Sequence, residues 1–135
     1  MKWRYVILTG IGIALCAAVL YLRMPAKPSG IPAAAEEERL VYLFSQGWKG
    51  REISAQEILV PAADDPVLAD YAALQAEQDL PLERYAGQPA VRYVYELEQS
   101  GLYAELLTAD GILIGAMCCD PAEHTVRRMN GKPFP

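Results

Sequence analysis

Histidine and cysteine are scarce: the chain has one histidine and three cysteines among 135 residues. His124 lies close in sequence to Cys118 and Cys119, whereas Cys16 is remote from all three. A structural zinc needs four ligands, and the spacing C-C-x4-H supplies at most three. Adjacent strand residues also point to opposite faces of a sheet, so the two thiols cannot easily share one ion. The sequence therefore predicts no metal site and no bound cofactor.

The neighbouring thiols leave other interpretations open. A catalytic cysteine needs a polar, electropositive setting, whereas Cys118 and Cys119 end an apolar run beside Asp120. A strained vicinal disulfide would be open to them outside the cell. The simplest interpretation is one thiol buried as a small apolar group and one that is half-exposed.

Sequence motifs for catalysis are also missing. The chain contains no G-x-x-x-x-G-K, G-x-S-x-G or H-E-x-x-H, and Gly10-x-Gly12 follows no predicted strand. These absences disfavour P-loop, serine-hydrolase and zinc-protease chemistry.

Carboxylates are plentiful but do not form an evident site. Glu96, Glu98 and Glu105 alternate with apolar residues, as on the solvated face of a sheet. Asp64 and Asp65 could contribute to a calcium site, but Asp65 before Pro66 is better placed as a helix cap. No catalytic residue is predicted, and we interpret the chain as a non-enzyme.

Acidic residues are absent from the first quarter of the chain. All 17 lie from Glu36 onward, against eight of the twelve basic residues, so residues 36–135 carry a formal charge of -9. A domain of this charge repels phosphate backbones and anionic lipid surfaces. Nucleic-acid binding is therefore excluded as a predicted function.

One long apolar run is present. Tyr5 to Leu22 contains no charge and is bounded by Arg4 and Arg23. A helix of this length covers about 27 Å, close to the thickness of a bilayer core. We predict that residues 1–24 form a signal-anchor transmembrane helix in contact with membrane lipid.

Three alternatives to an anchor were weighed. A cleaved signal peptide has a shorter apolar run followed by a small-x-small site, whereas this run ends in Leu-Tyr-Leu-Arg. A lipoprotein signal would modify Cys16 but needs a small residue in place of Leu15. A buried helix of a soluble domain would show a polar face, which this run lacks.

The remaining chain divides into a spacer and one domain. Residues 25–35 are rich in proline and alanine and predict a semi-rigid linker. Residues 36–135 are long enough for one core. A short basic N-terminus ahead of a first apolar segment predicts a cytoplasmic N-terminus and an extracellular domain in a single-pass protein of the cell membrane.

Periodicity predicts an α+β domain. A first helix begins at Glu36, buries Leu40, Leu43 and Phe44, and ends at Gly47, after which Trp48 folds back. Arg51 to Val60 is ambiguous between a strand and a helix with a Ser54–Glu57 capping box, and we favour the strand. A second helix starts at Asp65-Pro66 and runs to about Gln78, with one side formed by Val67, Leu68, Tyr71 and Leu74.

The C-terminal half predicts an antiparallel meander. Alternation predicts a strand over residues 91–97, Asp110-Gly111 predicts a hairpin between the strands 102–108 and 112–119, and residues 125–129 predict a short edge strand. The expected fold is two helices packed on one face of a four- to five-stranded, mainly antiparallel sheet. Most of its tyrosines should be buried with their hydroxyls at the rim: Tyr71, Tyr85, Tyr93, Tyr95 and Tyr103.

Several of these features together resemble a family of small extracytoplasmic domains of unknown function in Gram-positive bacteria. They are the Gly47-Trp48 helix end, the strand from Ile58 to Pro61, Tyr71-x-x-Leu74-Gln75, Tyr85-x-Gly87, Arg92-Tyr93-x-Tyr95, and the hairpin from Tyr103 through Asp110-Gly111 to Ile114-Gly115. The resemblance implies one N-terminal membrane segment and supplies no catalytic residues. A weaker likeness connects the domain to helix-plus-meander domains that regulate secreted peptidases.

The leading hypothesis is a membrane-anchored, non-enzymatic module that binds an unidentified protein or small ligand at the cell surface. The sequence does not locate the partner surface. Two alternatives remain: a small enzyme or peptidase-regulating domain with a carboxylate or thiol site, and a structural subunit of a membrane complex that packs Gly10 and Gly12 against a partner helix.

The predicted orientation can be tested by protease accessibility. Protease added to intact cells or spheroplasts should digest residues 36–135, because the domain is expected outside. Protection of the domain until the membrane is opened would contradict this orientation.

Overall fold

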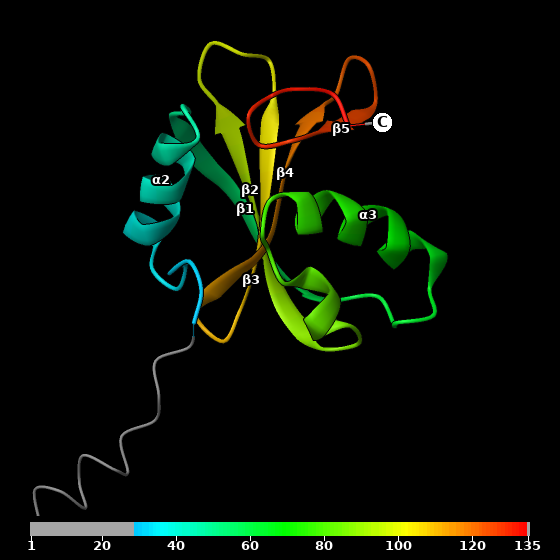
Figure 1. The fold of residues 1–135 in the computed structure, drawn as a ribbon. Coiled ribbons are helices and arrows are strands. Elements are labelled where there is room, and N and C mark those ends of the chain that lie inside the picture. The colour runs from blue at the N-terminus through cyan, green and yellow to red at the C-terminus, as the bar shows by residue number, and fades with distance from the viewer. Residues whose placement is uncertain (1–28, 135) are drawn as a thin grey trace, which may run out of the picture.

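The computed structural model describes residues 29–134. Within this range two α-helices, a short 3-10 helix and five strands follow one another along the chain (Figure 1). In chain order they are α2 (Glu36–Ser45), β1 (Gly50–Leu59), α3 (Pro66–Glu77), η1 (Leu82–Tyr85), β2 (Pro89–Leu97), β3 (Tyr103–Ala109), β4 (Ile112–Asp120) and β5 (Thr125–Arg127).

The strands form one sheet in the order β1-β2-β3-β4-β5, and each is antiparallel to its neighbour. The predicted α+β class, with two helices and an antiparallel meander, is confirmed. Asp110 and Gly111 both have positive φ, 52° and 76°, as the tight hairpin between β3 and β4 requires. The ambiguous segment is the strand β1, and no helix forms around Ser54.

The two helices lie on opposite faces of the sheet, so the prediction of one shared face is wrong. Leu106 and Leu107 are neighbours in β3, yet Leu106 packs in a cluster with Leu43 of α2 and Leu107 in a cluster with Leu68 of α3. Neighbouring strand residues point to opposite sides, so α2 and α3 cover different faces (Figure 1). β4 is apolar on both faces over most of its length, so each face of the sheet requires its own cover.

Helix α2 ends as predicted but buries a different stripe. The Trp48 N–H donates to the Leu43 carbonyl (2.9 Å) and the Gly47 N–H to the Phe44 carbonyl (3.0 Å), with Gly47 at φ 90°. Buried residues on the helix are Arg39, Tyr42 and Leu43, whereas Phe44 is 70% exposed. The expected burial of Phe44 is therefore wrong, because the helix turns its Arg39 side toward the sheet.

Helix α3 starts at the predicted cap. The Asp65 Oδ1 accepts a hydrogen bond from the Val67 N–H (2.9 Å), and Pro66 is the first helical residue. Leu68 and Leu74 are buried, but Val67 is 51% exposed. The prediction is therefore confirmed for Leu68 and Leu74 and wrong for Val67, and Gln75 lies on the buried side of the helix instead.

The outer edge of β4 is covered at three places. The Leu113 N–H donates to the Ile31 carbonyl (2.9 Å) near one end, and β5 pairs with Cys118 to Asp120 at the other. Between them, the Ala116 N–H donates to the Gln75 Oε1 and its carbonyl accepts from the Gln78 Nε2, both at 2.8 Å. The side chains of Gln75 in α3 and of Gln78 at its C-terminal cap thereby bond backbone groups of β4 that no neighbouring strand bonds.

A buried arginine connects the start of the domain to the sheet. The Arg39 Nε donates to the Tyr95 hydroxyl (3.0 Å), its Nη1 to the carbonyls of Ala33 (3.1 Å) and Ala34 (2.9 Å), and its Nη2 to Glu52 (3.1 Å). The guanidinium also lies 3.6 Å from the centre of the Tyr93 ring. Burial alone would lower the pKa of Arg39, but the hydrogen bonds with Tyr95 and Glu52 outweigh it and raise that pKa. Arg39 therefore remains charged and joins the N-terminal segment, α2, β1 and β2.

Removing this guanidinium should destabilise the domain strongly. We expect Arg39→Met to lower the free energy of unfolding by about 3–5 kcal/mol, because it removes the donor to two carbonyls and leaves Glu52 with only the Tyr95 hydroxyl (2.9 Å) and no positive partner. The matched control is Arg51→Met, which removes the exposed Arg51–Glu96 pair and should cost less than about 1 kcal/mol. Urea unfolding of the full chain in detergent, followed by Trp48 fluorescence in a Trp3→Phe background, measures both. Equal effects of the two substitutions would contradict the account.

Candidate functional site

The predicted membrane anchor, Tyr5 to Leu22, lies outside the described residues. Within residues 29–134, no helix is both long and apolar enough to span a membrane.

Cys118, Cys119 and His124, which we considered for a metal or thiol site, do not come together in the structure. Cys118 is fully buried with its Sγ 3.8 Å from the Met129 carbonyl, and Cys119 is half-buried on the opposite face of β4. Both thiols are free. His124 is exposed in the turn between β4 and β5 with φ 54°. The prediction of one buried and one half-exposed thiol is confirmed.

Both thiols are held in their neutral form. Burial raises the pKa of Cys118 to about 11. Burial, helped by the neighbouring carboxylate of Glu105, raises the pKa of Cys119 to about 12. A thiol that stays protonated near neutral pH is a poor nucleophile and a poor metal ligand.

The carboxylates considered for a site form ion pairs with arginines or accept hydrogen bonds from backbone N–H groups. Glu96 accepts from Arg51 (2.8 Å) and Glu105 accepts from Arg92 (2.6 Å) across neighbouring strands. Asp120 accepts from two backbone N–H groups of the β4–β5 turn and from the Arg127 side chain (2.7 Å). In the part of the chain that the structure describes, no three His, Cys, Asp or Glu side chains come close enough to hold a metal ion.

The tyrosines contribute mainly to the core. Tyr95 is fully buried, and Tyr93, Tyr85 and Tyr103 are half-buried. Tyr71 is 37% exposed, on the side of α3 that borders the sheet. The expectation that most of these tyrosines are buried is therefore wrong: only Tyr95 is, and its hydroxyl accepts from the buried Arg39. Tyr71 is the most exposed of the five.

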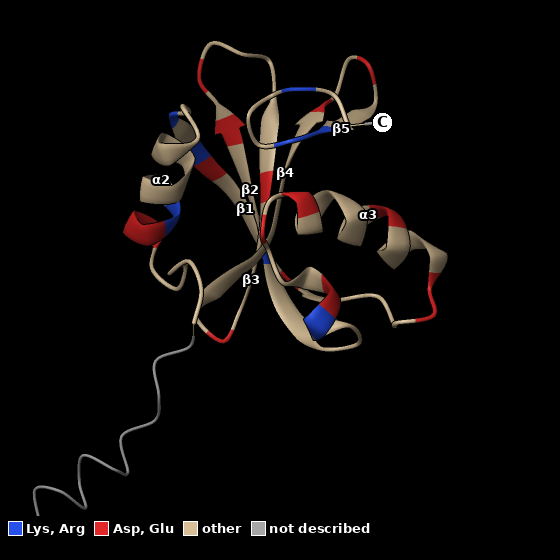
Figure 2. Ribbon diagram, in the orientation of Figure 1, with Lys and Arg blue, Asp and Glu red and all other residues tan. Residues whose placement is uncertain are grey.

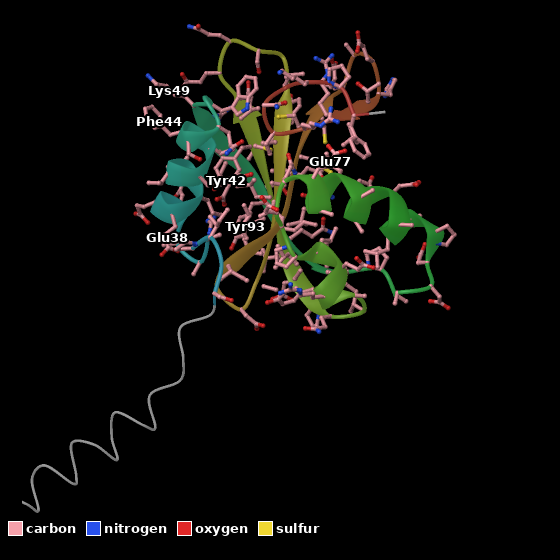
Figure 3. All side chains as sticks on the ribbon, viewed as in Figure 1. Glu38, Tyr42, Phe44, Lys49, Glu77 and Tyr93 are labelled. Carbon is pink, nitrogen blue, oxygen red and sulfur yellow. The ribbon has the colours of Figure 1, made fainter. Side chains whose placement is uncertain are left out.

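An apolar surface on α2 is the first candidate for a binding site. Val41 and Phe44 are 69% and 70% exposed, and they adjoin the half-buried Leu40 and Trp48. Together these four residues form the α2 patch, which surrounds a shallow depression of about 370 Å³ that reaches Gly50 at the start of β1. Figure 3 shows Phe44 on the outer side of the helix, turned away from Tyr93.

Among residues 29–134, no acidic residue lines the depression at the patch, although the domain is acidic, and the one charged residue there is Lys49. In α2 the acidic first turn is followed by Arg39, which is buried, and then by uncharged residues, whereas acidic residues recur on α3 and in the loops (Figure 2). Next to the patch, β1 lies at the edge of the sheet, and among the described residues only β2 pairs with it. A bulge between Glu52 and Ser54 interrupts the β1–β2 pairing.

A groove on the other face is the second candidate. It has a volume of about 420 Å³ and lies between α3, the end of β1 and the sheet. Its lining is mostly apolar, and its polar floor is the Arg92–Glu105 ion pair, after which we name it the Arg92 groove. The apolar lining residues include Ile58, Val60, Leu68, Leu82, Leu107 and Met117.

Sequence reasoning missed both candidate surfaces. The sequence predicts Phe44 in the core and Glu105 on a solvated sheet face, and it gives Arg92 no role at a site. The sequence feature that could have indicated the exposure of Phe44 is Arg39, a basic residue next to the acidic helix start. Burial of Arg39 against the sheet turns Phe44 toward solvent.

Comparison with known protein families, with curated proteins and with solved structures finds no match to this chain.

The thiols should be almost unreactive in the folded protein. At pH 8 a thiol with a pKa of about 11 has about 100-fold less thiolate than one at its ordinary value of 9. We therefore expect a thiol reagent to modify Cys118 and Cys119 in a Cys16→Ser protein at least about 100-fold more slowly than in the urea-unfolded chain. Reaction of either thiol at the unfolded rate would contradict its raised pKa, and reaction faster than that would show an activated cysteine and favour an enzyme.

Proposed function

We propose that the chain is a membrane-anchored module that binds a protein partner at the outer face of the cell membrane. The α2 patch is the contact surface in this proposal. The observation that carries it is the exposure of Val41 and Phe44 side by side on one helix. Single exposed apolar residues are ordinary, but adjoining ones that border an aromatic residue are typical of interfaces.

Burial of the patch against a partner would contribute favourable binding energy. Full burial of one Phe or Val side chain contributes about 1.5–3 kcal/mol. Aromatic residues at the centre of an interface often contribute most of its affinity. Because residues 36–135 carry a charge of -9, the partner surface should be apolar at its centre and neutral or basic around it.

The residues considered for catalysis support binding instead. The two thiols have raised pKa values. His124 lies in the β4–β5 turn, and Asp120, at the end of β4, accepts hydrogen bonds from the backbone of that turn.

Ala33 is buried and the Ile31 carbonyl is bonded to β4, so the last residues of the predicted linker pack on the domain. The predicted anchor over residues 1–24 and the part of the predicted linker, residues 25–35, that precedes Ile31 would hold the patch near the membrane, where a membrane-bound partner is concentrated.

Site-specific photocrosslinking in the native membrane tests this function. A photoreactive residue at position 44 should give a discrete heavier product that contains a second protein. The matched control is position 67 on α3, because Val67 is also exposed but lies far from the patch in sequence and on the other helix.

Substitution then tests the contact itself. With the photoreactive residue moved to position 41, also exposed on the patch, Phe44→Ser should abolish the product while changing stability by less than about 0.5 kcal/mol, because Phe44 is already exposed. Val67→Ser should leave the product unchanged. Equal products at positions 44 and 67, or a product that contains only the protein itself, would contradict the proposal.

A further inference from the structure

The Arg92 groove has the size and lining of a ligand site. Its volume of about 420 Å³ falls within the range of small-molecule and peptide side-chain sites. The walls come from four places in the chain: the end of β1, helix α3 with Tyr71 at the rim, Leu82 of η1, and Leu107 and Met117 of the sheet. These walls suit a branched or aromatic apolar group.

The floor of the groove offers a hydrogen-bond donor beside an acceptor. Arg92 Nη2 donates to Glu105 Oε1 at 2.6 Å, which is the single hydrogen bond that the Arg92 side chain makes within residues 29–134. The Arg92 Nε–H is buried without a partner. The side chains of Arg92 and Glu105 are 38% and 22% exposed, so the pair has N–H groups and a carboxylate oxygen left for a ligand.

This pair selects against charged and purely hydrocarbon ligands. An anion would meet Glu105 and the acidic domain, and a cation would meet Arg92. A hydrocarbon would remove water from both charged groups and return no hydrogen bond. An uncharged amide satisfies both groups, because its carbonyl accepts from Arg92 and its N–H donates to Glu105.

We propose that the Arg92 groove binds an uncharged apolar segment of a polypeptide. One apolar side chain occupies the walls, and an adjacent backbone amide contacts Arg92 and Glu105. The groove lies on the α3 face and the α2 patch on the opposite face. The two surfaces are therefore independent, and this site can exist whether or not the α2 patch binds a partner.

Three small probes that share one side chain test the chemistry. Acetyl-leucine N-methylamide is neutral, acetyl-leucine is an anion and leucine N-methylamide is a cation. In a nuclear magnetic resonance titration of the full chain in detergent, the neutral probe should shift the amide resonances of Leu107 and Met117 and bind most tightly. Tighter binding of either charged probe, or no shift with the neutral one, would overturn the proposal.

Two double substitutions test the floor of the groove. Arg92→Met with Glu105→Leu replaces the pair by apolar side chains and should weaken the neutral probe by about tenfold or more. The matched control is Arg51→Met with Glu96→Leu, which removes the other cross-strand Arg–Glu pair at 2.8 Å, outside the groove, and should leave binding unchanged. Equal binding by both variants would overturn the assignment of the floor.

A third variant still tests the groove if the Arg92→Met, Glu105→Leu protein does not fold. Tyr71→Ala removes a wall from the rim without touching the sheet, so it should also weaken the neutral probe. Unchanged binding by Tyr71→Ala would place the probe elsewhere on the protein.

Discussion

The buried guanidinium of Arg39 is the contact on which the arrangement of the domain depends. It binds the carbonyls of Ala33 and Ala34, the carboxylate of Glu52 and the hydroxyl of Tyr95. A buried charge is tolerated only where such partners are in place. Because Arg39 must face the sheet, the helix that carries it has one orientation, and Phe44 is left in solvent. The candidate partner surface on α2 thus follows from a polar contact in the core.

The sheet imposes the second constraint. β4 is buried and apolar on both faces from Ile112 to Cys118, so one helix cannot cover it. Helix α2 covers one face together with Trp48 and Met129, and α3 covers part of the other. The part of the α3 face that remains open contains the Arg92–Glu105 pair and becomes a groove. Gln75 and Gln78 fix α3 at this position by bonding the edge of β4.

Local chemistry made many of the elements predictable. Asp65-Pro66 marked the start of α3, Gly47 the end of α2, and Asp110-Gly111 the hairpin, because each depends on a conformation that few residues adopt. The faces of the helices were not predictable in the same way. Burial of Arg39 depends on Tyr95, which is distant in sequence. The Arg92–Glu105 contact likewise depends on a register in which Arg92 lies opposite Leu107 and Glu105 opposite Val94.

Arg39 and Tyr95 act as one unit that orients α2 on the sheet. A double-mutant cycle of Arg39→Met and Tyr95→Phe, measured by urea unfolding of the full chain, tests it most directly. The account predicts that the two changes are not additive, with a coupling free energy of about 1–3 kcal/mol. Additivity to within about 0.5 kcal/mol would show that the contact does not hold the helix, and would contradict the account.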